Sequence, residues 1–597
     1  MIVGTTRRPV SGPNFAVLVA LAWLVIVADL VARHWAGTGV TLADTDDAMR
    51  LAEVRDFLHG QGWFDMHQPR LAPPIGYDSH WSRLIDAGLA GLFLLFHQFV
   101  DGALAERLMR VVWPLLWLIP AMVGAAAIAW RIAGRNAAVV ALLMAAVGLP
   151  AFQQFVPGRI DHHNVQIALA VAIVAATVWS DRARGAAFAA GALSGLALAI
   201  GLENLAFVAL CGAAFALRYV VDRAGGGALA RYGWSLAASA AAAFFVIVGP
   251  DHWGRTECDA IAVNWAAPVV LVGIFMAIVA TRLEGDRVAA RIAAVAAGAA
   301  LAGLVFVLIE PRCLAGPFGM MDPQLRAIWL SHINEMQPLT AIGRNSPPVA
   351  AALAAFPALA AAATLLLARD LRRDFGFLVA GAVLLVACAM AVLVAKMSMY
   401  AMWLGMPLVA VLALRLFARL HLESLVARAF AALLLTPTVL SAVAIAAVQA
   451  AGSPPAQEHD TRVLTGCFAT ASYAQLARLP AGVIAAEPDF GPFILALTPQ
   501  SVVAAPYHRL AGGIIAAHRM FTAPPDEARE VLQRLGATYV VTCGRRVPPE
   551  MTAQERAASL WGRLQAGAVP GWLLPVPAER GDVFQVYRVA AEATEHR

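Results

Sequence analysis

The chain has 597 residues, of which 60% are hydrophobic and only 14% are charged. A soluble protein of this length would carry nearly twice that share of charge, so the composition excludes a soluble protein and indicates one with several membrane spans. The net charge of +5 is spread over short loops, a pattern that reports membrane orientation and says nothing about nucleic acid, so no nucleic-acid partner is expected.

Thirteen apolar stretches are long enough to cross a bilayer as α-helices, since about 20 residues span its hydrocarbon core. They lie near residues 14–34, 107–130, 136–156, 163–180, 185–201, 203–218, 233–250, 265–281, 288–309, 347–368, 374–395, 399–418 and 427–449. We therefore predict a mainly α-helical, polytopic membrane region over residues 1–450.

Arginines mark every second connection between these stretches and so indicate the orientation of the chain. The marked connections carry Arg131/Arg135, Arg182/Arg184, Arg218/Arg223/Arg231, Arg282/Arg287, Arg369/Arg372/Arg373 and Arg415/Arg419. Because positively charged loops stay in the cytoplasm, the opposite face is predicted to be the outer one, with its first loop at 35–106 and its fifth at 310–346. The apolar stretch 84–101 would break this alternation as a span, so we expect it to lie along the outer interface.

The tail, residues 451–597, is predicted to form a small α/β domain on the outer face. Short runs rich in β-branched residues at 483–486, 501–505 and 539–542 indicate strands, and the polar spacing of 525–535 indicates a helix. The tail therefore differs in character from the apolar region before it.

Four of the six cysteines fall in the predicted outer regions. Cys258 and Cys313 lie on two outer loops, and Cys467 and Cys543 lie in the tail. An oxidising outer compartment permits both pairs as disulfides, and the alternative is four free thiols.

Three outer segments carry polar residues that can bind cations or move protons. The first follows the first apolar stretch and holds Asp44, Asp46 and Asp47. Adjacent carboxylates repel one another unless a cation or a proton offsets them, and beside a membrane this favours a metal, a proton path or a phosphorylated lipid. The others are 158–163 (GRIDHH) and 333–338 (INEMQP). Together these side chains could close around a divalent cation, while each segment alone is more typical of a solvated loop.

These segments resemble motifs of oligosaccharyltransferase catalytic subunits, in the C-type superfamily (GT-C) of membrane glycosyltransferases. Asp46-Asp47, Arg55, 63–65 (WFD) and 74–76 (PIG) match the first outer loop of that family in order and spacing. The GRIDHH segment corresponds to its second acidic motif, and INEMQP to the motif of its fifth outer loop. The resemblance implies transfer of a sugar or oligosaccharide from a polyprenyl phosphate or diphosphate to a protein or glycan acceptor.

The resemblance also assigns roles to individual residues. Asp46, Asp161 and Glu335 correspond to groups that bind a metal or activate the acceptor, with Asp47 as the alternative to Asp46. His163 stands where the family has a carboxylate, and imidazole suits manganese or zinc better than magnesium. The divalent metal, Mn or Mg, is therefore expected to differ from that of the family or to be absent.

Further polar residues are candidates for contact with the donor phosphate or the acceptor. The phosphate candidates are Arg70, His80, Arg83, Arg344 and Lys396, and the acceptor candidates are Asp489, His508 and Arg509. Lys396 could instead extend its side chain along the apolar surface to place its charge in water. Residues 507–509 could form an ordinary turn. Glu203, just inside a span, is expected to line a cavity. The segment 487–491 (EPDFG) lacks the paired tryptophans of the family's acceptor motif, so asparagine glycosylation is not specifically supported.

The sequence thus favours an enzyme of a bacterial inner membrane whose active site and tail face the periplasm. One alternative is transfer of a single sugar to an envelope glycan or lipid. Another is a lipid flippase or ion-coupled transporter, with the aspartates as a proton or ion site. Acidic residues gathered at one surface, without related halves in the sequence, favour the transferase.

Overall fold

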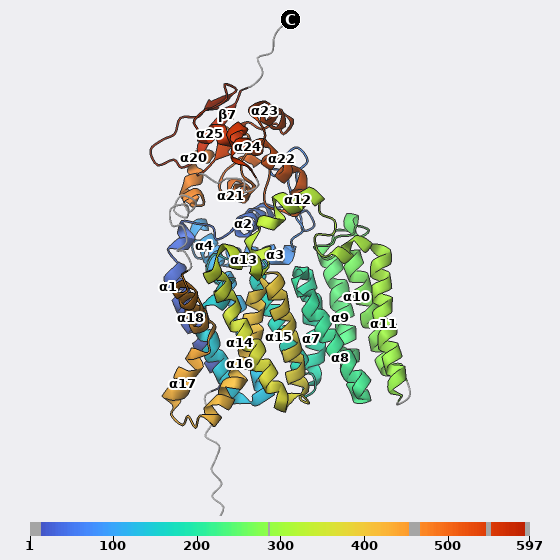
Figure 1. Ribbon diagram of the computed structural model, residues 1–597. Helices are drawn as coiled ribbons and strands as arrows, with labels where there is room; N and C mark the ends of the chain where they lie inside the picture. Colours follow the sequence, from blue (N-terminus) through green and yellow to red (C-terminus); the bar gives the residue numbers. More distant parts are fainter. Residues whose placement is uncertain (1–13, 284–286, 453–465, 545–550, 591–597) are drawn as a thin grey trace, which may run out of the picture.

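The computed structural model describes residues 14–283, 287–452, 466–544 and 551–590. A bundle of long helices carries a smaller part, which contains a β-sheet, on one of its ends (Figure 1). Within the described ranges, nine helices are long and apolar enough to cross a membrane. They are α1 (Phe15–His34), α4 (Gly102–Ala133), α8 (Leu205–Val221), α9 (Gly226–Ile247), α10 (Val263–Arg282), α11 (Val288–Ile309), α14 (Pro347–Leu371), α15 (Phe375–Leu393) and α16 (Met397–Arg419).

A tenth candidate span is broken. Helices α17 (Leu425–Leu434) and α18 (Pro437–Ala450) are bent by 52° at the short break between them. The break precedes Pro437 at the first position of α18, where a missing backbone N–H costs no helical hydrogen bond. Three predicted spans form shorter apolar helices of 12 to 17 residues: α5 (Arg135–Ala146), α6 (His163–Trp179) and α7 (Arg184–Ile200). A polytopic helical protein is thus confirmed, with nine or ten helices of spanning length among the thirteen predicted stretches.

Short elements cover the end of the bundle that carries the sheet. They are α2 (Thr45–Leu58), β1 (His67–Gln68), β2 (Tyr77–Asp78), α3 (Arg83–His97), α12 (Pro323–Ile328) and α13 (Leu339–Asn345). Helix α3 occupies most of the stretch predicted to lie at the interface, and it is not among the helices that meet the criteria for a span. It lies at the end of the bundle that carries the sheet (Figure 1). It exposes Leu94 and Leu95, as an interfacial helix would.

The tail forms a five-stranded sheet with strand order β4-β3-β5-β7-β6. Its strands are β3 (Val483–Ala485), β4 (Ser501–Val502), β5 (Tyr539–Thr542), β6 (Leu573–Pro575) and β7 (Gln585–Val589). Its helices are α20 (Ala474–Ala477), α21 (Gly491–Leu497), α22 (Ala511–Thr522), α23 (Pro525–Arg534), α24 (Ala553–Ala558) and α25 (Leu560–Gln565). The three predicted strands are the parallel core β4-β3-β5, whereas β7 and β6 add antiparallel strands that the sequence analysis missed.

Both expected disulfides are present. Cys258 bonds Cys313 at 2.07 Å, and Cys467 bonds Cys543 at 2.13 Å. The first joins two loops beside the bundle, and the second lies within the tail. Cys211 is a buried free thiol.

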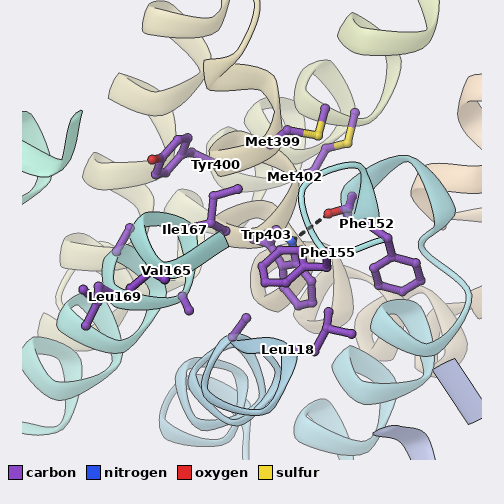
Figure 2. Close-up of a cluster of buried hydrophobic side chains, with 14 of the residues drawn as sticks. Leu118, Phe152, Phe155, Val165, Ile167, Leu169, Met399, Tyr400, Met402 and Trp403 are labelled. Carbon is purple, nitrogen blue, oxygen red and sulfur yellow. Dashed lines mark hydrogen bonds between the residues drawn. The ribbon is translucent and has the colours of Figure 1, made fainter. Parts of the chain in front are cut away.

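Helix α16 runs through the centre of the bundle and anchors its core. Trp403 is completely buried and packs edge-on against Phe155 (Figure 2). Its indole N–H donates to the carbonyl oxygen of Ala151 at 3.0 Å, so the polar atom of this ring is satisfied inside an apolar cluster. The rigid packing fixes the start of α16, where Lys396 and Tyr400 lie.

Helices α7 and α9 approach closely because small residues face each other. A Cβ atom added to Gly191 would lie 2.1 Å from Ser235 Oγ and 2.4 Å from the backbone oxygen of Tyr232. Gly195, one turn later, meets Ser239 in the same way. Small residues four apart allow membrane helices to gain packing and hydrogen bonds at short range.

Gly191→Ala is therefore expected to force α7 and α9 apart and to destabilise the protein by about 1–3 kcal/mol. The control is Gly185→Ala in the same helix, where an added Cβ would meet no atom within 4 Å. Thermal melting of both variants in detergent measures the effect. Equal melting temperatures would contradict the proposed close contact.

Candidate active site

A cavity of about 1980 Å³ lies where the bundle meets the tail. Its wall combines segments far apart in the chain: the start of α2, the loop after β2, the start of α6, the segment before α8, the loop before α10, residues 332–336, the start of α16 and loops of the tail. Polar side chains on this wall include Asp46, His80, His162, His163, Glu203, Glu335, Lys396, Asp489, His508 and Arg509. The predicted candidates from separate loops therefore converge on one space.

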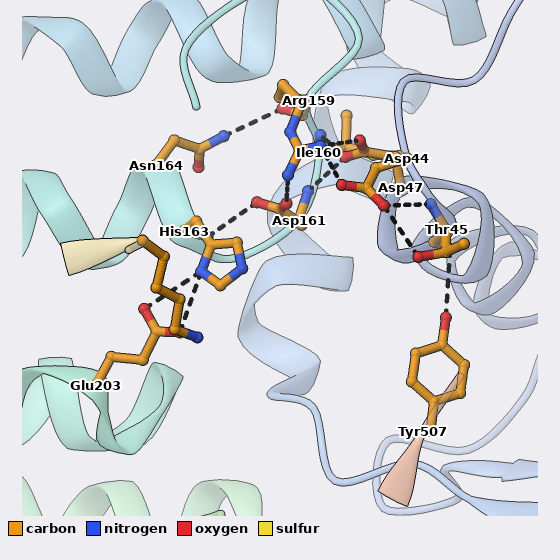
Figure 3. Close-up of polar contacts among 11 residues, drawn as sticks. Asp44, Thr45, Asp47, Arg159, Ile160, Asp161, His163, Asn164, Glu203 and Tyr507 are labelled. Atoms are coloured by element: carbon orange, nitrogen blue, oxygen red, sulfur yellow. Dashed lines mark hydrogen bonds and ion pairs between the residues drawn. The ribbon is translucent and has the colours of Figure 1, made fainter. Parts of the chain in front are cut away.

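One wall of the cavity is built on a network of aspartates around Arg159 (Figure 3). The Arg159 Nη1 atom lies 2.7 Å from Asp44 Oδ2 and 3.2 Å from Asp47 Oδ2, and Nη2 donates to Asp161 Oδ2. The backbone N–H groups of Ile160 and Asp161 both donate to Asp47 Oδ1, at 2.6 and 3.1 Å. These bonds fasten the first turn of α2 to the loop before α6.

The local sequence explains this geometry. Asp44 caps α2 by accepting a hydrogen bond from the backbone N–H of Thr45 at 2.5 Å. Asp46 and Asp47 then fall in the first turn, where the helix dipole favours negative charge. Gly158 has φ +106°, which a residue with a side chain rarely adopts, and this turn directs Arg159 back toward α2.

The carboxylates of this wall have different proton affinities. Burial and then the neighbouring carboxylates of Asp44 and Glu335 raise the pKa of Asp46 well above its usual value. Burial also raises the pKa of Asp47, to about 7, against the opposing charge of Arg159. Burial would also raise the pKa of Asp161, but Arg159 and the nearby imidazoles lower that pKa to about 2. Asp46 is thus the carboxylate on the cavity wall best suited to accept a proton.

A second cluster surrounds Glu203 on the side of the bundle. The Glu203 carboxylate accepts from Lys396 Nζ at 2.6 Å and from the Tyr400 hydroxyl at 2.8 Å. It also lies 3.2 Å from Nδ1 of His163. Glu203 lines the cavity as predicted, and its negative charge is balanced by these partners.

His162, His163 and Glu203 have the geometry of a possible metal group. Their ligand atoms lie within 4.8 Å of one another, and Nδ1 of His162 is buried without a hydrogen-bond partner among the described residues. Two imidazoles and a carboxylate are a zinc-type donor set. Of the four residues predicted to hold a cation (Asp46, Asp161, His163 and Glu335), only His163 belongs to this group. The Asp161 oxygens already accept from Arg159 and from the His163 backbone N–H.

The tail is fastened over the cavity by a third cluster, at Asp259. Its carboxylate accepts two hydrogen bonds from Arg509, at 2.6 and 2.9 Å, and lies 2.7 Å from His508 Nε2. Burial would raise the pKa of Asp259, but its interaction with His80 and its hydrogen bonds to His508 and Arg509 hold that pKa far below its usual value. The adjacent Cys258–Cys313 disulfide ties the same loop to the start of segment 310–346.

Three predicted phosphate ligands lie away from the cavity wall. The Arg70 guanidinium donates to the backbone oxygens of Leu495, Thr498 and Gln500. Arg83 is buried against Asp86 and the backbone of the first outer loop. Arg344 is exposed on α13. Asp47 and Asp161 are also buried behind the wall, next to Asp46.

Several residues of the site were not singled out from the sequence. Arg159, Asp259 and His162 all lie within or beside quoted motifs, but nothing in their spacing shows which partner each one contacts. An acidic residue next to a loop cysteine was the available signal for Asp259. For Arg159 the signal was a cation two residues before Asp161 in an otherwise acidic motif.

Comparisons with proteins of known structure identify the fold. The apo oligosaccharyltransferase of Archaeoglobus fulgidus matches 97% of this chain and 74% of its own, with a TM-score of 0.67 and 16% identity. The chain has the fold of a GT-C membrane glycosyltransferase. The predicted family resemblance is thereby confirmed at the level of the fold. No family model matches the sequence, and no curated protein matches it significantly.

Two further structures of the archaeal protein contain ligands. One holds an inhibitory peptide and a dolichol-phosphate, and it matches 96% of this chain and 74% of its own with a TM-score of 0.65 and 15% identity. The other holds zinc and sulfate, and it matches 96% of this chain and 73% of its own with a TM-score of 0.56 and 16% identity. At these identities the likeness concerns the fold.

Asp259→Asn is expected to destabilise the docking of the tail by about 1–3 kcal/mol, because the half-buried Arg509 loses two charge-assisted hydrogen bonds and keeps only its ion pair with Glu257. The depressed folded-state pKa means that this contribution is complete at neutral pH and fades only as the pH falls below about 4. Thermal melting at pH 7 measures the loss. Asp251→Asn, at an exposed residue of the same loop, is the control, and equal destabilisation by both changes would contradict this role.

Proposed function

We propose that this protein transfers a sugar or oligosaccharide from a polyprenyl phosphate or diphosphate to an acceptor. The observation that carries the proposal is the placement of Asp46. Its carboxylate faces a large cavity, has a raised pKa, and has no hydrogen-bond or ion-pair partner among the described residues. A proton acceptor and several cationic groups around one space at the end of a membrane bundle suit the transfer of a group from a lipid phosphate.

In this mechanism the acceptor atom forms a bond to the anomeric carbon while the bond from that carbon to the phosphate oxygen breaks. The electron pair leaves with the phosphate, and the acceptor proton passes to Asp46. Direct displacement predicts inversion at the anomeric carbon. Glu335, close enough to raise the pKa of Asp46, helps to position the acceptor, and Lys396 stabilises the charge on the departing phosphate.

The remaining assignments follow from the layout of the cavity. His80, Asp489, His508 and Arg509 lie on its wall and are proposed to contact the donor or the acceptor. A cation held by His162, His163 and Glu203 would add positive charge beside the leaving phosphate. The chain is proposed to cross a bacterial inner membrane thirteen times, with the cavity and the tail on the periplasmic face. The acceptor is a protein, a glycan or a lipid of the envelope.

Asp46→Asn is expected to lower kcat by about 10²–10⁴-fold, because the amide cannot accept the acceptor proton. The measurement is product formation from a radiolabelled polyprenyl-linked sugar by purified protein. Asp56→Asn, on the same helix but away from the cavity, is the matched control and should retain activity. Wild-type turnover by Asp46→Asn would remove Asp46 from the mechanism.

Lys396→Gln is expected to weaken binding of the donor by about 10-fold or more, equivalent to about 1.4 kcal/mol, because the phosphate loses a nearby cation. The control is Arg344→Gln, since Arg344 is exposed and does not line the cavity. Binding of the lipid-linked donor and of the same lipid without phosphate should be measured for both variants. An unchanged affinity in Lys396→Gln, or an equal loss in Arg344→Gln, would contradict the assignment.

Transport is the alternative from another class. A transporter would move the lipid or an ion without forming a product, and a pH gradient would drive that movement in proteoliposomes. Formation of a glycosylated product that depends on Asp46 separates the two functions. Uptake that depends on Asp46, with no product from any donor, would favour transport.

A further inference from the structure

The Arg159 side chain lies at the point where three aspartates from two distant segments meet. Asp44 and Asp47 come from α2, and Asp161 lies two residues after Arg159. Arg159 itself is only 8% exposed, and Asp47 and Asp161 are almost completely buried. The Asp44 side chain is more exposed, at 42%. Two buried carboxylates beside a third require a compensating cation, and here the cation is part of the chain.

Hydrogen bonds occupy three of the four carboxylate oxygens of Asp47 and Asp161, and the fourth, Oδ2 of Asp47, is ion-paired with Arg159 at 3.2 Å without accepting a hydrogen bond. Oδ1 of Asp47 accepts two backbone N–H groups, and Oδ1 of Asp161 accepts the backbone N–H of His163 at 2.9 Å. Oδ2 of both residues faces the guanidinium. A hard divalent cation takes several oxygen ligands at about 2.0–2.6 Å, so it could enter this centre only by displacing Arg159.

We propose that Arg159 takes the place of a divalent cation at the aspartate centre, which therefore works without a metal between Asp47 and Asp161. Arg159 is a positioning residue: it fastens the first turn of α2 to the loop before α6, and this contact directs the neighbouring Asp46 toward the cavity. The effect on catalysis through Asp46 rests on the proposed function. The presence of Arg159 in place of a cation does not depend on that function. The His162–His163–Glu203 group uses other ligand atoms, although the backbone N–H of His163 donates to Asp161.

The direct test is binding of Mn²⁺ followed by electron paramagnetic resonance. Arg159→Ser should bind about one more Mn²⁺ per chain than the wild type, because it leaves three carboxylates without a cation. The double variant Arg159→Ser/Asp161→Asn should lose this extra ion, which places it at the aspartate centre. Arg159→Lys keeps the positive charge and should bind no extra ion.

Thermal melting provides a second readout that does not depend on any donor or product. Arg159→Ser should melt at a lower temperature than the wild type, and Mn²⁺ should raise its melting temperature more than that of the wild type. A residue with only a packing role would not give this rescue.

Two results would overturn the proposal. One is stoichiometric Mn²⁺ binding by the wild type that is lost in Asp161→Asn, since the centre would then hold a metal beside Arg159. The other is equal Mn²⁺ binding by Arg159→Ser and the wild type. If Arg159→Ser fails to fold, the wild type, Asp161→Asn and Arg159→Lys still decide the question. Absence of transfer with these binding results intact would count against the proposed function alone.

Discussion

The ion pairs between Arg159 and the aspartates at the start of α2 are the interaction on which the site depends. Carboxylates brought together beside a membrane repel one another, and water is too scarce behind the cavity wall to screen them. The guanidinium offsets that repulsion from within the chain. Arg159 and the backbone hold Asp47 and Asp161 behind the cavity wall, whereas the adjacent Asp46 faces the cavity and has a raised pKa.

The cavity exists only because the tail is held across the end of the bundle. On one side, Arg70 holds the tail in two ways. Its backbone oxygen accepts from the N–H of Val502 at the edge of the sheet, and its guanidinium donates to the backbone oxygen of Thr498. On the other side Asp259 holds Arg509, and the Tyr507 hydroxyl donates to the backbone oxygen of Thr45 at the start of α2. The same contacts that position the tail therefore border the acidic wall, which couples the folding of the outer part to the geometry of the site.

Much of the architecture could be predicted because it depends on local chemistry. A bilayer requires long apolar helices whose backbone bonds are satisfied internally, so hydropathy located the long helices. Strands β3, β4 and β5 followed from short β-branched runs, and both disulfides join cysteines that were paired by assuming an oxidising outer compartment. Strands β6 and β7 were missed because both are partly exposed and both depend on pairing, β7 with β5 and β6 with β7.

The sequence by itself determined the class of the protein, the helices and the motifs that converge on the cavity, since composition and residue order carry that information. Only the tertiary structure decided which groups the charged side chains contact. Arg70 and Arg83 looked like phosphate ligands, yet their donors are used by backbone oxygens and Asp86. Arg159 contacts Asp44, 115 positions away, because a turn at Gly158 reverses the chain. The sequence shows which residues are charged but not where their side chains point, so the ion-pair partners are decided only when distant segments pack together.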